Sequence, residues 1–228
     1  MTNESSTPCP SRLDIENLSI RRGDVLAIDS LHLHLDAGKV TLIRGANGSG
    51  KTTLIHAIAG LLPSQAGTIV GTHQRRIALV PQMLPAAQSL PLTVKAAVTM
   101  GCWPIKGLLR PTDTRDVNAA HRALEAVGLG DLAHRQLATL SGGQRQRVLV
   151  AQAIVQAPHI LLMDEPTAAA DAHSCKVIFE SAKRCAQAGA IVLIASHDDD
   201  AHQWADRVIT LEAGRVLSDT LAKPGRIT

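Results

Sequence analysis

The sequence predicts an α/β protein in which a mostly parallel sheet is covered by helices. Three observations predict this fold class. Short apolar runs of strand length occur at residues 40–43, 77–80, 160–163 and 191–195. Stretches with helical spacing alternate with these runs, which is typical of a parallel sheet with crossover helices. A glycine-rich loop also separates the first of these runs from a helical stretch.

Composition limits the classes of function. The chain has 228 residues, of which 45% are apolar, so it can form one domain, or one domain with an inserted subdomain. Only 1% are aromatic and the net charge is +3, so neither base stacking nor a strong positive field indicates a nucleic-acid partner. The four cysteines form no C-x-x-C pair and are expected to be reduced thiols of a cytosolic protein.

Residues 13–43 are predicted to form two to three strands. Three leucines alternate strictly with His32 and His34, so the leucines face a core and the histidines face outward: Leu31, Leu33 and Leu35. Two histidines on one face could hold a metal ion. A solvated sheet face is the better interpretation, because no third ligand is nearby in the sequence.

Residues 45–52 read Gly-Ala-Asn-Gly-Ser-Gly-Lys-Thr, a phosphate-binding loop of the Gly-x-x-x-x-Gly-Lys-Thr type. The loop lies between the strand 40–43 and a helix predicted over 53–59, which is the context in which this motif binds phosphate. The glycines let backbone N–H groups point inward, and the helix N-terminus adds partial positive charge. Lys51 can reach the β- and γ-phosphates of a nucleotide, and the Thr52 hydroxyl can bind Mg²⁺.

The remaining elements follow along the chain. Residues 60–71 read as a loop, and Pro and Gly are dense from 81 to 111. Helical spacing predicts three helices, the second of which Pro158 ends: 116–135, 144–156 and 174–188. The first carries four apolar residues on one face: Ala120, Leu124, Val127 and Leu132. Late strands are predicted at 208–211 and 216–217.

Two further motifs stand at the ends of predicted elements. Residues 140–144, Leu-Ser-Gly-Gly-Gln, open a helix, where two glycines and a serine expose N–H groups and a hydroxyl suited to phosphate. Asp164 and Glu165 end an apolar strand, and α/β sheets bind their ligands at this carboxyl edge. Asp164 can hold Mg²⁺ together with Thr52, and Glu165 can polarise an attacking water.

Polar residues also follow two other predicted strands. His197 follows the strand 191–195 and can contact the γ-phosphate, and Gln82 follows 77–80 and can reach the metal or the water. Alone, His197 would be a capping or surface histidine, but its place among the other motifs favours a site. A metal site formed by His197 and His202 is disfavoured, because five residues separate them and put them off one helical face.

Together these motifs resemble those of the nucleotide-binding subunits of ATP-binding-cassette (ABC) transporters, from about residue 13 to residue 217. The resemblance implies a P-loop NTPase fold of the ABC type, with an antiparallel β subdomain and an inserted helical subdomain. The expected division is as follows: a disordered tail over 1–12, a single ATPase domain over 13–221 with the helical subdomain at about 84–157, and a tail over 222–228.

The resemblance also implies ATP and Mg²⁺ as cofactors and names the parts of the site. The catalytic residues are Glu165, His197 and Gln82, and the Mg²⁺ ligands are Thr52, Gln82 and Asp164. The nucleotide-binding residues are Gly45, Ala46, Asn47, Gly48, Ser49, Gly50, Lys51, Thr52 and Thr53 of Walker A, Ser141, Gly142, Gly143 and Gln144 of the signature, Asp171 of the D-loop, and Arg22.

In this family two cassettes pair head to tail. The resemblance therefore implies a homodimer in which Ser141 and Gly143 serve the partner's ATP, so that one chain alone hydrolyses poorly. It further implies an integral membrane permease, an indirect link to an extracytoplasmic solute-binding protein, and a peripheral position at the cytoplasmic face of the plasma (inner) membrane.

Two departures from the family pattern stand out. Many cassettes stack an aromatic residue on adenine, but the neighbourhood here is Ile-Arg-Arg-Gly at residues 20–23 and the chain has no Tyr. Arg22 can stack its guanidinium plane on the base, and a surface arginine is the equal alternative. The D-loop, residues 168–171, has Ala170 where leucine is common.

The cargo is inferred from resemblance alone. Pro-Leu-Thr-Val at 91–94 followed by Val-Thr-Met-Gly at 98–101 resembles cassettes of the zinc/manganese uptake family. An iron-siderophore or haem importer is the alternative, although Cys102 stands where those cassettes have arginine. A soluble, non-transport ABC protein is a further alternative, but those usually carry two cassettes or a long insertion. An unrelated P-loop kinase is disfavoured by residues 140–144.

Overall fold

The computed structural model describes residues 11–82, 91–107, 110–168 and 170–221. Most of the predicted amino-terminal tail, the carboxyl-terminal tail 222–228 and Ala169 of the predicted D-loop lie outside the described residues. The first strand begins at Arg12, the last residue of the predicted tail.

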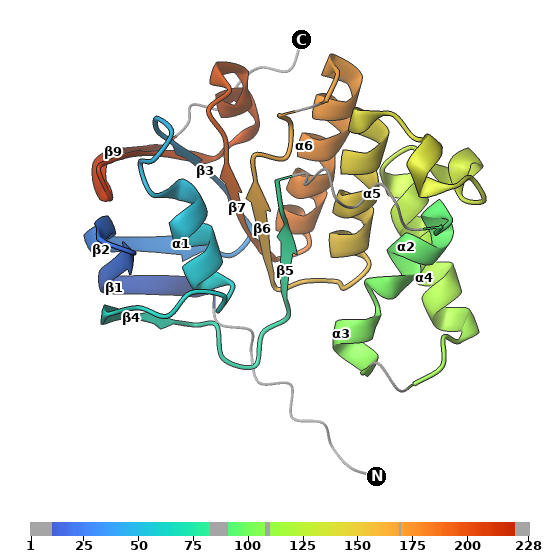
Figure 1. Cartoon of the computed structure of the whole chain (residues 1–228), viewed down its shortest axis with the longest axis horizontal. Coiled ribbons are helices and arrows are strands. Elements are labelled where there is room, and N and C mark those ends of the chain that lie inside the picture. Colours follow the sequence, from blue (N-terminus) through green and yellow to red (C-terminus); the bar gives the residue numbers. More distant parts are fainter. Residues whose placement is uncertain (1–10, 83–90, 108–109, 169, 222–228) are drawn as a thin grey trace.

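A six-stranded sheet forms the centre of the fold, in the order β5-β6-β7-β3-β8-β9 (Figure 1). Its strands are β3 (Val40–Arg44), β5 (Ile77–Val80), β6 (Ile160–Asp164), β7 (Ile191–Ala195), β8 (Arg207–Glu212) and β9 (Arg215–Leu221). Neighbours from β5 to β8 pair in parallel, and β9 pairs with β8 in antiparallel. The apolar runs that predicted strands 40–43, 77–80, 160–163 and 191–195 are therefore confirmed as a parallel core.

A second, antiparallel sheet has three strands in the order β2-β1-β4: β1 (Arg12–Arg22), β2 (Val25–Asp36) and β4 (Ala66–Val70). The three leucines of β2 are buried and His32 is exposed, as the alternation predicts. The prediction of a loop over 60–71 is wrong, because β4 lies within it. This short edge strand is mostly exposed, so no buried face marks it in the sequence.

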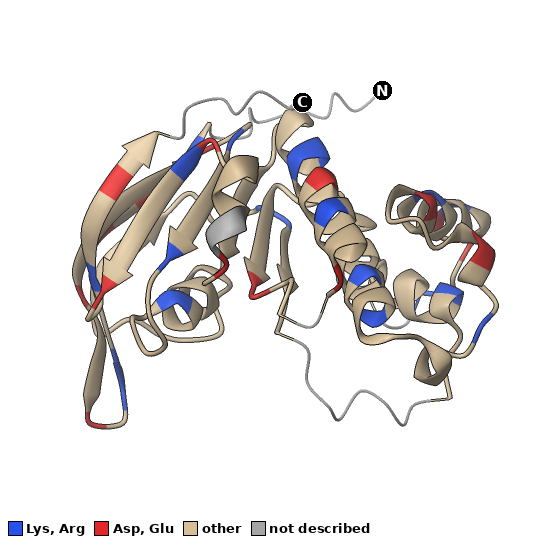
Figure 2. Ribbon diagram, turned by 90° about the horizontal axis from the view of Figure 1, so that it is seen from above, with Lys and Arg blue, Asp and Glu red and all other residues tan. Residues whose placement is uncertain are grey.

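Helices cover both faces of the six-stranded sheet. They are α1 (Lys51–Ile58), α2 (Val94–Met100), α3 (Trp103–Lys106), α4 (Thr114–Ala126), α5 (Gly142–Ile154) and α6 (Ala172–Gln187), with short 3-10 turns at Gly130–Leu132, Leu137–Thr139 and Asp199–Trp204. α1 contacts both sheets, whereas α5 and α6 contact the opposite face of the central sheet. Figures 1 and 2 show α2 and α4 on the side away from the three-stranded sheet, with α5 and α6 between.

Two predicted helices differ from the observed ones at their ends. The helix predicted over 116–135 stops at Ala126, because the chain turns at Gly128, where φ is +65°. The helix predicted over 144–156 begins at Gly142, because Ser141 caps it. It ends at Ile154, a few residues before Pro158.

Alternate residues of the central strands enter two separate cores. Leu42, Leu161 and Ile194 pack toward α5 and α6, whereas Ile43 and Leu162 pack toward α1 and the three-stranded sheet. Because both faces of these strands are buried, their sequences read as continuous apolar runs. The carboxyl ends of β3, β5, β6 and β7 then meet at one edge, where the polar motifs follow.

Candidate functional site

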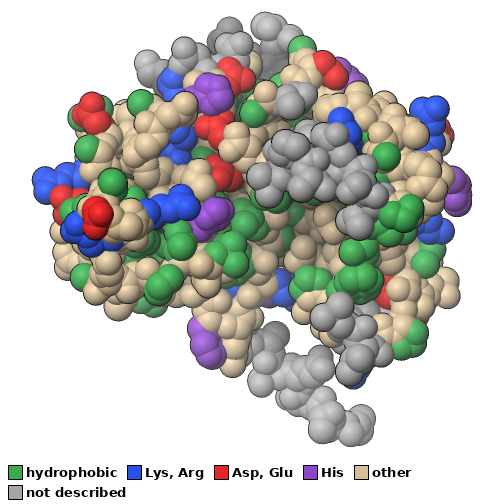
Figure 3. Space-filling view, in the orientation of Figure 1, with side chains coloured by type: hydrophobic (Ala, Val, Ile, Leu, Met, Phe, Trp, Pro, Cys, Tyr) green, Lys and Arg blue, Asp and Glu red, His purple; other side chains and the backbone are tan. Residues whose placement is uncertain are grey.

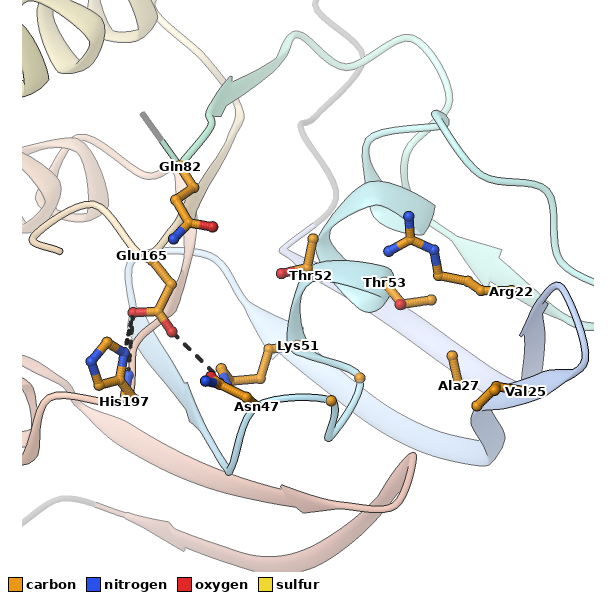
Figure 4. Close-up of a pocket in the computed structure, with 12 residues that line it drawn as sticks. Arg22, Val25, Ala27, Asn47, Lys51, Thr52, Thr53, Gln82, Glu165 and His197 are labelled. Atoms are coloured by element: carbon orange, nitrogen blue, oxygen red, sulfur yellow. Dashed lines mark hydrogen bonds and ion pairs between the residues drawn. The ribbon is translucent and has the colours of Figure 1, made fainter. Parts of the chain in front are cut away.

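An open cavity of about 500 Å³ lies at this carboxyl edge (Figure 4). Its lining comes from four predicted motifs and from the neighbouring β1–β2 hairpin. The lining residues are Arg22, Val25, Ala27, Asn47, Gly48, Gly50, Lys51, Thr52, Thr53, Gln82, Glu165 and His197. The structure thus brings together residues that are up to 175 positions apart, Arg22 and His197.

Three glycines of the phosphate loop, Gly45, Gly48 and Gly50, have a positive φ that other residues rarely adopt. Gly48 has φ of +83°, and a Cβ added to it would meet no heavy atom within 4 Å, whereas Gly50 has φ of +107°. A Cβ on Gly50 would lie 2.6 Å from the Ala27 carbonyl oxygen, so this glycine also permits close packing. Gly50 is the N-cap of α1, which begins at Lys51 and points its N-terminus at the cavity.

Lys51 is buried at the base of the loop. Its ammonium Nζ donates to the carbonyl oxygens of Gly45, at 2.7 Å, and Ala46, at 3.2 Å. Nζ also lies 3.9 Å from Glu165 Oε1. An ammonium has three donors, so Lys51 is a buried cation that retains capacity to bind an anion in the cavity.

The candidate metal ligands of Walker A and Walker B are in contact. Thr52 Oγ1 donates to Asp164 Oδ1 at 3.1 Å, although the two residues are 112 positions apart in the sequence. Both are oxygen ligands, and Mg²⁺ is bound through one or two such groups together with phosphates. The residues present therefore fit Mg²⁺ when it accompanies a nucleotide.

Glu165 and His197 are in hydrogen-bond contact beside the lysine. His197 Nδ1 lies 2.8 Å from Glu165 Oε2, and the Glu165 side chain is only 10% exposed (Figure 4). Glu165 has φ of +47°, a conformation that a non-glycine residue adopts at an energetic cost, and its amide donates to the Ala195 carbonyl at 2.9 Å. The sharp turn after β6 aims this carboxylate at the cavity.

Gln82 and Arg22, which were also predicted to belong to the site, line opposite sides of the cavity. Gln82 follows β5 and extends toward Glu165, whereas Arg22 lies on the opposite side of the cavity at the end of β1 (Figure 4). Val25 and Ala27, which no motif predicts, also line the cavity from β2 beside Arg22. Their place directly after the Arg22 turn was the only signal in the sequence.

The signature residues and Asp171 do not line this cavity. Ser141 caps α5: its Oγ accepts from the Gln144 amide at 3.2 Å, and Gln144 Oε1 accepts from the Ser141 amide at 2.9 Å. Gly143 packs closely, since a Cβ there would lie 2.7 Å from Ser174 Oγ. Asp171 caps α6, and the Ser174 amide that donates to its carboxylate lowers the pKa of Asp171.

The start of α5 and the start of α6 therefore pack against each other, and none of the described signature or D-loop residues lines the cavity at the phosphate loop. Ser141 is exposed at the start of α5, and Gly142 is partly exposed. A single chain brings one half of the predicted nucleotide contacts into the cavity and leaves the other half outside it.

Fold and cavity define a P-loop nucleotide-binding domain: a glycine-rich loop between β3 and α1, with an acidic pair at the end of β6 at the same edge of the sheet. The comparison with known families is more specific, because residues 28–168 match the ABC transporter family. The chain belongs to this family. It is an ATP-binding ABC subunit, an ATPase whose hydrolysis is coupled to transport.

Relatives of similar length support this assignment. The chain is 36% identical over 201 residues to the zinc import ATP-binding protein ZnuC of Ruegeria sp. (strain TM1040), covering 87% of this chain and 76% of that protein. It is 34% identical to the manganese transport system ATP-binding protein MntB of Listeria innocua, covering 82% and 80%. It is 32% identical to a probable siderophore transport ATP-binding protein, YusV of Bacillus subtilis, covering 92% and 80%.

Solved structures share the fold. A putative metal-chelate type ABC transporter in an inward-facing conformation has a TM-score of 0.81 and 26% identity, covering 96% of this chain and 85% of that chain. A nucleotide-free ATP-binding cassette has a TM-score of 0.80 and 25% identity, covering 92% and 91%. The predicted fold class is thereby confirmed.

The described part of the chain contains neither a membrane-spanning helix nor a group of three or more metal-ligating His, Cys, Asp or Glu side chains. None of the helices that the structure describes is both long and apolar enough to cross a bilayer. Within the same residues, no group of three or more His, Cys, Asp and Glu side chains could hold a metal ion. His32 of the considered histidine pair instead contacts Asn17 Oδ1 through Nε2, at 2.7 Å.

Proposed function

We propose that this chain is the ATPase subunit of an importer for zinc or manganese ions. The observation that carries the cargo assignment is the similarity, over more than four-fifths of the chain, to proteins whose names specify zinc import and manganese transport. The cavity itself does not select a cargo. It supports the ATPase part of the proposal, because it combines a phosphate loop, a pair of Mg²⁺ ligands and a buried carboxylate.

The chain's own residues have distinct roles in the proposed reaction. Lys51 and the N–H groups at the start of α1 bind the β- and γ-phosphates of ATP. Thr52 and Asp164, with Gln82, would hold Mg²⁺, and the bound ion would supply positive charge beside the transferred phosphoryl group. Glu165 accepts a proton from the attacking water, and His197, paired to it at 2.8 Å, keeps the carboxylate oriented.

Completion of the site requires a second copy of the chain. Ser141, Gly143 and Asp171 lie outside the cavity, and a head-to-tail dimer would bring them to the partner's nucleotide. One solved structure with the same fold, at a TM-score of 0.78 and 24% identity, is described as the dimeric structure of a bacterial ABC transporter cassette. At this identity the likeness indicates the fold alone, so dimerisation of this chain is part of the proposal.

A permease docks, in this proposal, on the helical side of the molecule. α3 exposes Trp103 and Ile105, and an apolar cavity of about 390 Å³ lies between α3 and α2, lined by Leu92, Met100, Trp103 and Val117 among others. Figure 3 shows hydrophobic side chains gathered where Figure 1 places these helices. The ATPase would then lie at the cytoplasmic face of the membrane and be linked to a solute-binding protein only through the permease.

Deletion of the gene in its native host tests the cargo. We expect lower cellular zinc or manganese under limitation of that metal, restored by the intact gene but not by a Glu165→Gln copy. The similarity to a siderophore transport protein supports an iron-chelate importer as the second candidate. Unchanged zinc and manganese together with reduced uptake of a ferric siderophore would replace the first assignment with the second.

A further inference from the structure

A second cavity, of about 670 Å³, lies at the opposite edge of the central sheet. Its lining comes from the residues that precede β5, β6 and β7 and from the last turns of α4, α5 and α6. β5 and β6 enter the sheet from this edge, the lower one in Figure 1, and end at the nucleotide site. The two cavities share no lining residue, so two ligands can be bound together.

Two arginines are fixed at the wall of this cavity. Arg184 Nη2 donates to the Ala126 carbonyl at 2.6 Å and to Ser181 Oγ at 2.9 Å. Arg76 donates from Nε and Nη2 to the Ala157 carbonyl, at 2.9 and 2.8 Å. Within the described part of the chain, the Nη1 group of each guanidinium makes no hydrogen bond, and it remains a donor for a ligand.

The charged side chains that line this cavity are cationic. His159 lines the cavity, and burial together with the charges of Arg76 and Arg75 lowers the pKa of its imidazole. No Asp or Glu is among the described lining residues. The carboxyl ends of α4, α5 and α6 each contribute about half a negative charge. The full positive charges of the Arg76 and Arg184 guanidinium groups exceed that total. A negatively charged group is therefore favoured here over a neutral or positive one.

The rest of the lining is mainly apolar. Alanines, Ile154 and Pro158 form most of the remaining wall. We propose that this cavity binds a small amphiphilic organic anion, with its acid group at Arg76 and Arg184 and its apolar part against the alanine and proline wall. This site lies beyond the proposed transport function and does not depend on the identity of the cargo.

Decanoate is the probe for this proposal, and decanol is its uncharged counterpart. Binding is measured by calorimetry on the full chain with saturating ADP, so that the phosphate loop is filled and cannot bind the probe. We expect one decanoate per chain, at least tenfold weaker binding of decanol, and about tenfold weaker decanoate binding in Arg184→Met, which loses a charged hydrogen bond. Arg115→Met, an exposed arginine at the other end of α4, should bind decanoate as the parent chain does.

Cys185 gives a second readout that does not require removal of an arginine. Its thiol lines the cavity, whereas Cys175 lies outside it. Decanoate should slow alkylation of Cys185 by iodoacetamide at least several-fold and leave Cys175 unchanged, as followed by peptide mass spectrometry. Ala126→Leu, which fills the cavity from α4, should abolish this protection.

Three outcomes would overturn the proposal. They are non-saturable decanoate binding, equal binding of decanol, and protection of Cys185 that survives Ala126→Leu. In each case the two arginines serve only to cap the carbonyl ends of the helices that they contact.

Discussion

Substitution of the loop glycines by alanine separates two physical reasons for glycine. Gly48 is exposed, with φ of +83°, and a Cβ added to it would have no heavy atom within 4 Å, so Gly48→Ala adds backbone strain without a clash. Gly50 is buried, with φ of +107°, and its Cβ would lie 2.6 Å from the Ala27 carbonyl oxygen and 2.8 Å from Ile28 Cδ1. Gly50→Ala therefore adds strain and overpacking together.

The expected losses of stability differ by about 2 kcal/mol. A left-handed alanine costs about 1–2 kcal/mol, offset by roughly 0.5–1 kcal/mol from the smaller entropy of the unfolded chain. We expect Gly48→Ala to lower the free energy of unfolding by about 1 kcal/mol. Overpacking adds about 1–3 kcal/mol, which brings the expected loss for Gly50→Ala to about 3 kcal/mol.

Urea denaturation without nucleotide measures both losses. The transition is followed by circular dichroism and by fluorescence of the two tryptophans, since coincident curves justify a two-state free energy. Absence of nucleotide matters because a ligand that binds only the folded state would shift the midpoint. Equal losses for the two variants would refute the reasoning, because only Gly50 faces a backbone oxygen.

Two further predictions concern charged groups. Arg207 is buried and donates from Nε and Nη2 to Asp219 at 2.8 and 2.6 Å, so Asp219→Asn should cost about 1–2 kcal/mol at pH 7, discounted because Asp219 is 42% exposed. The hydrogen bond from Arg207 lowers the pKa of Asp219. The pair therefore stabilises the fold fully above the unfolded pKa near 3.9, and this stabilisation is lost as the pH falls below about 4. Urea titrations at several pH values should show the unfolding free energies of the parent chain and Asp219→Asn converging below pH 4, and a constant difference would contradict this. Arg22→Ala should weaken ATP binding about three- to tenfold if the guanidinium contacts the base, measured with a fluorescent ATP analogue. Arg21→Ala is its control, since Arg21 lies outside the cavity and donates to the Asp24 carbonyl, and equal effects of the two changes would remove Arg22 from the site.

The sequence predicts the central sheet well because its signal is local. The strands at Ile160–Asp164 and Ile191–Ala195 are buried on both faces, so every residue is apolar until the polar motif at the end. The edge strand β4 lacks such a signal, and its pairing with β1 depends on residues about 50 positions away. The end of α4 was missed for a different reason, because Val127 continues the buried face after the helix has ended.

The candidate site is also predicted only in part from the sequence. Motif spacing predicts that Thr52, Asp164, Glu165 and His197 meet at one edge, and the structure brings them together there. Motif spacing does not predict the 2.8 Å contact between Glu165 and His197, because this contact depends on the backbone turn at Glu165. Contacts between two side chains of this kind depend on the directions of the side chains, which motif spacing in the sequence does not specify.

In the proposed function, ATP is enclosed between two copies of this chain. Glu165→Gln tests it most directly, because the change removes the proposed base while keeping the size of the side chain and the nucleotide contacts. Light scattering after size exclusion should give the mass of one chain with ADP and twice that mass with saturating ATP and Mg²⁺, with hydrolysis lost. A Glu165→Gln protein that binds ATP yet retains the mass of one chain would contradict the account.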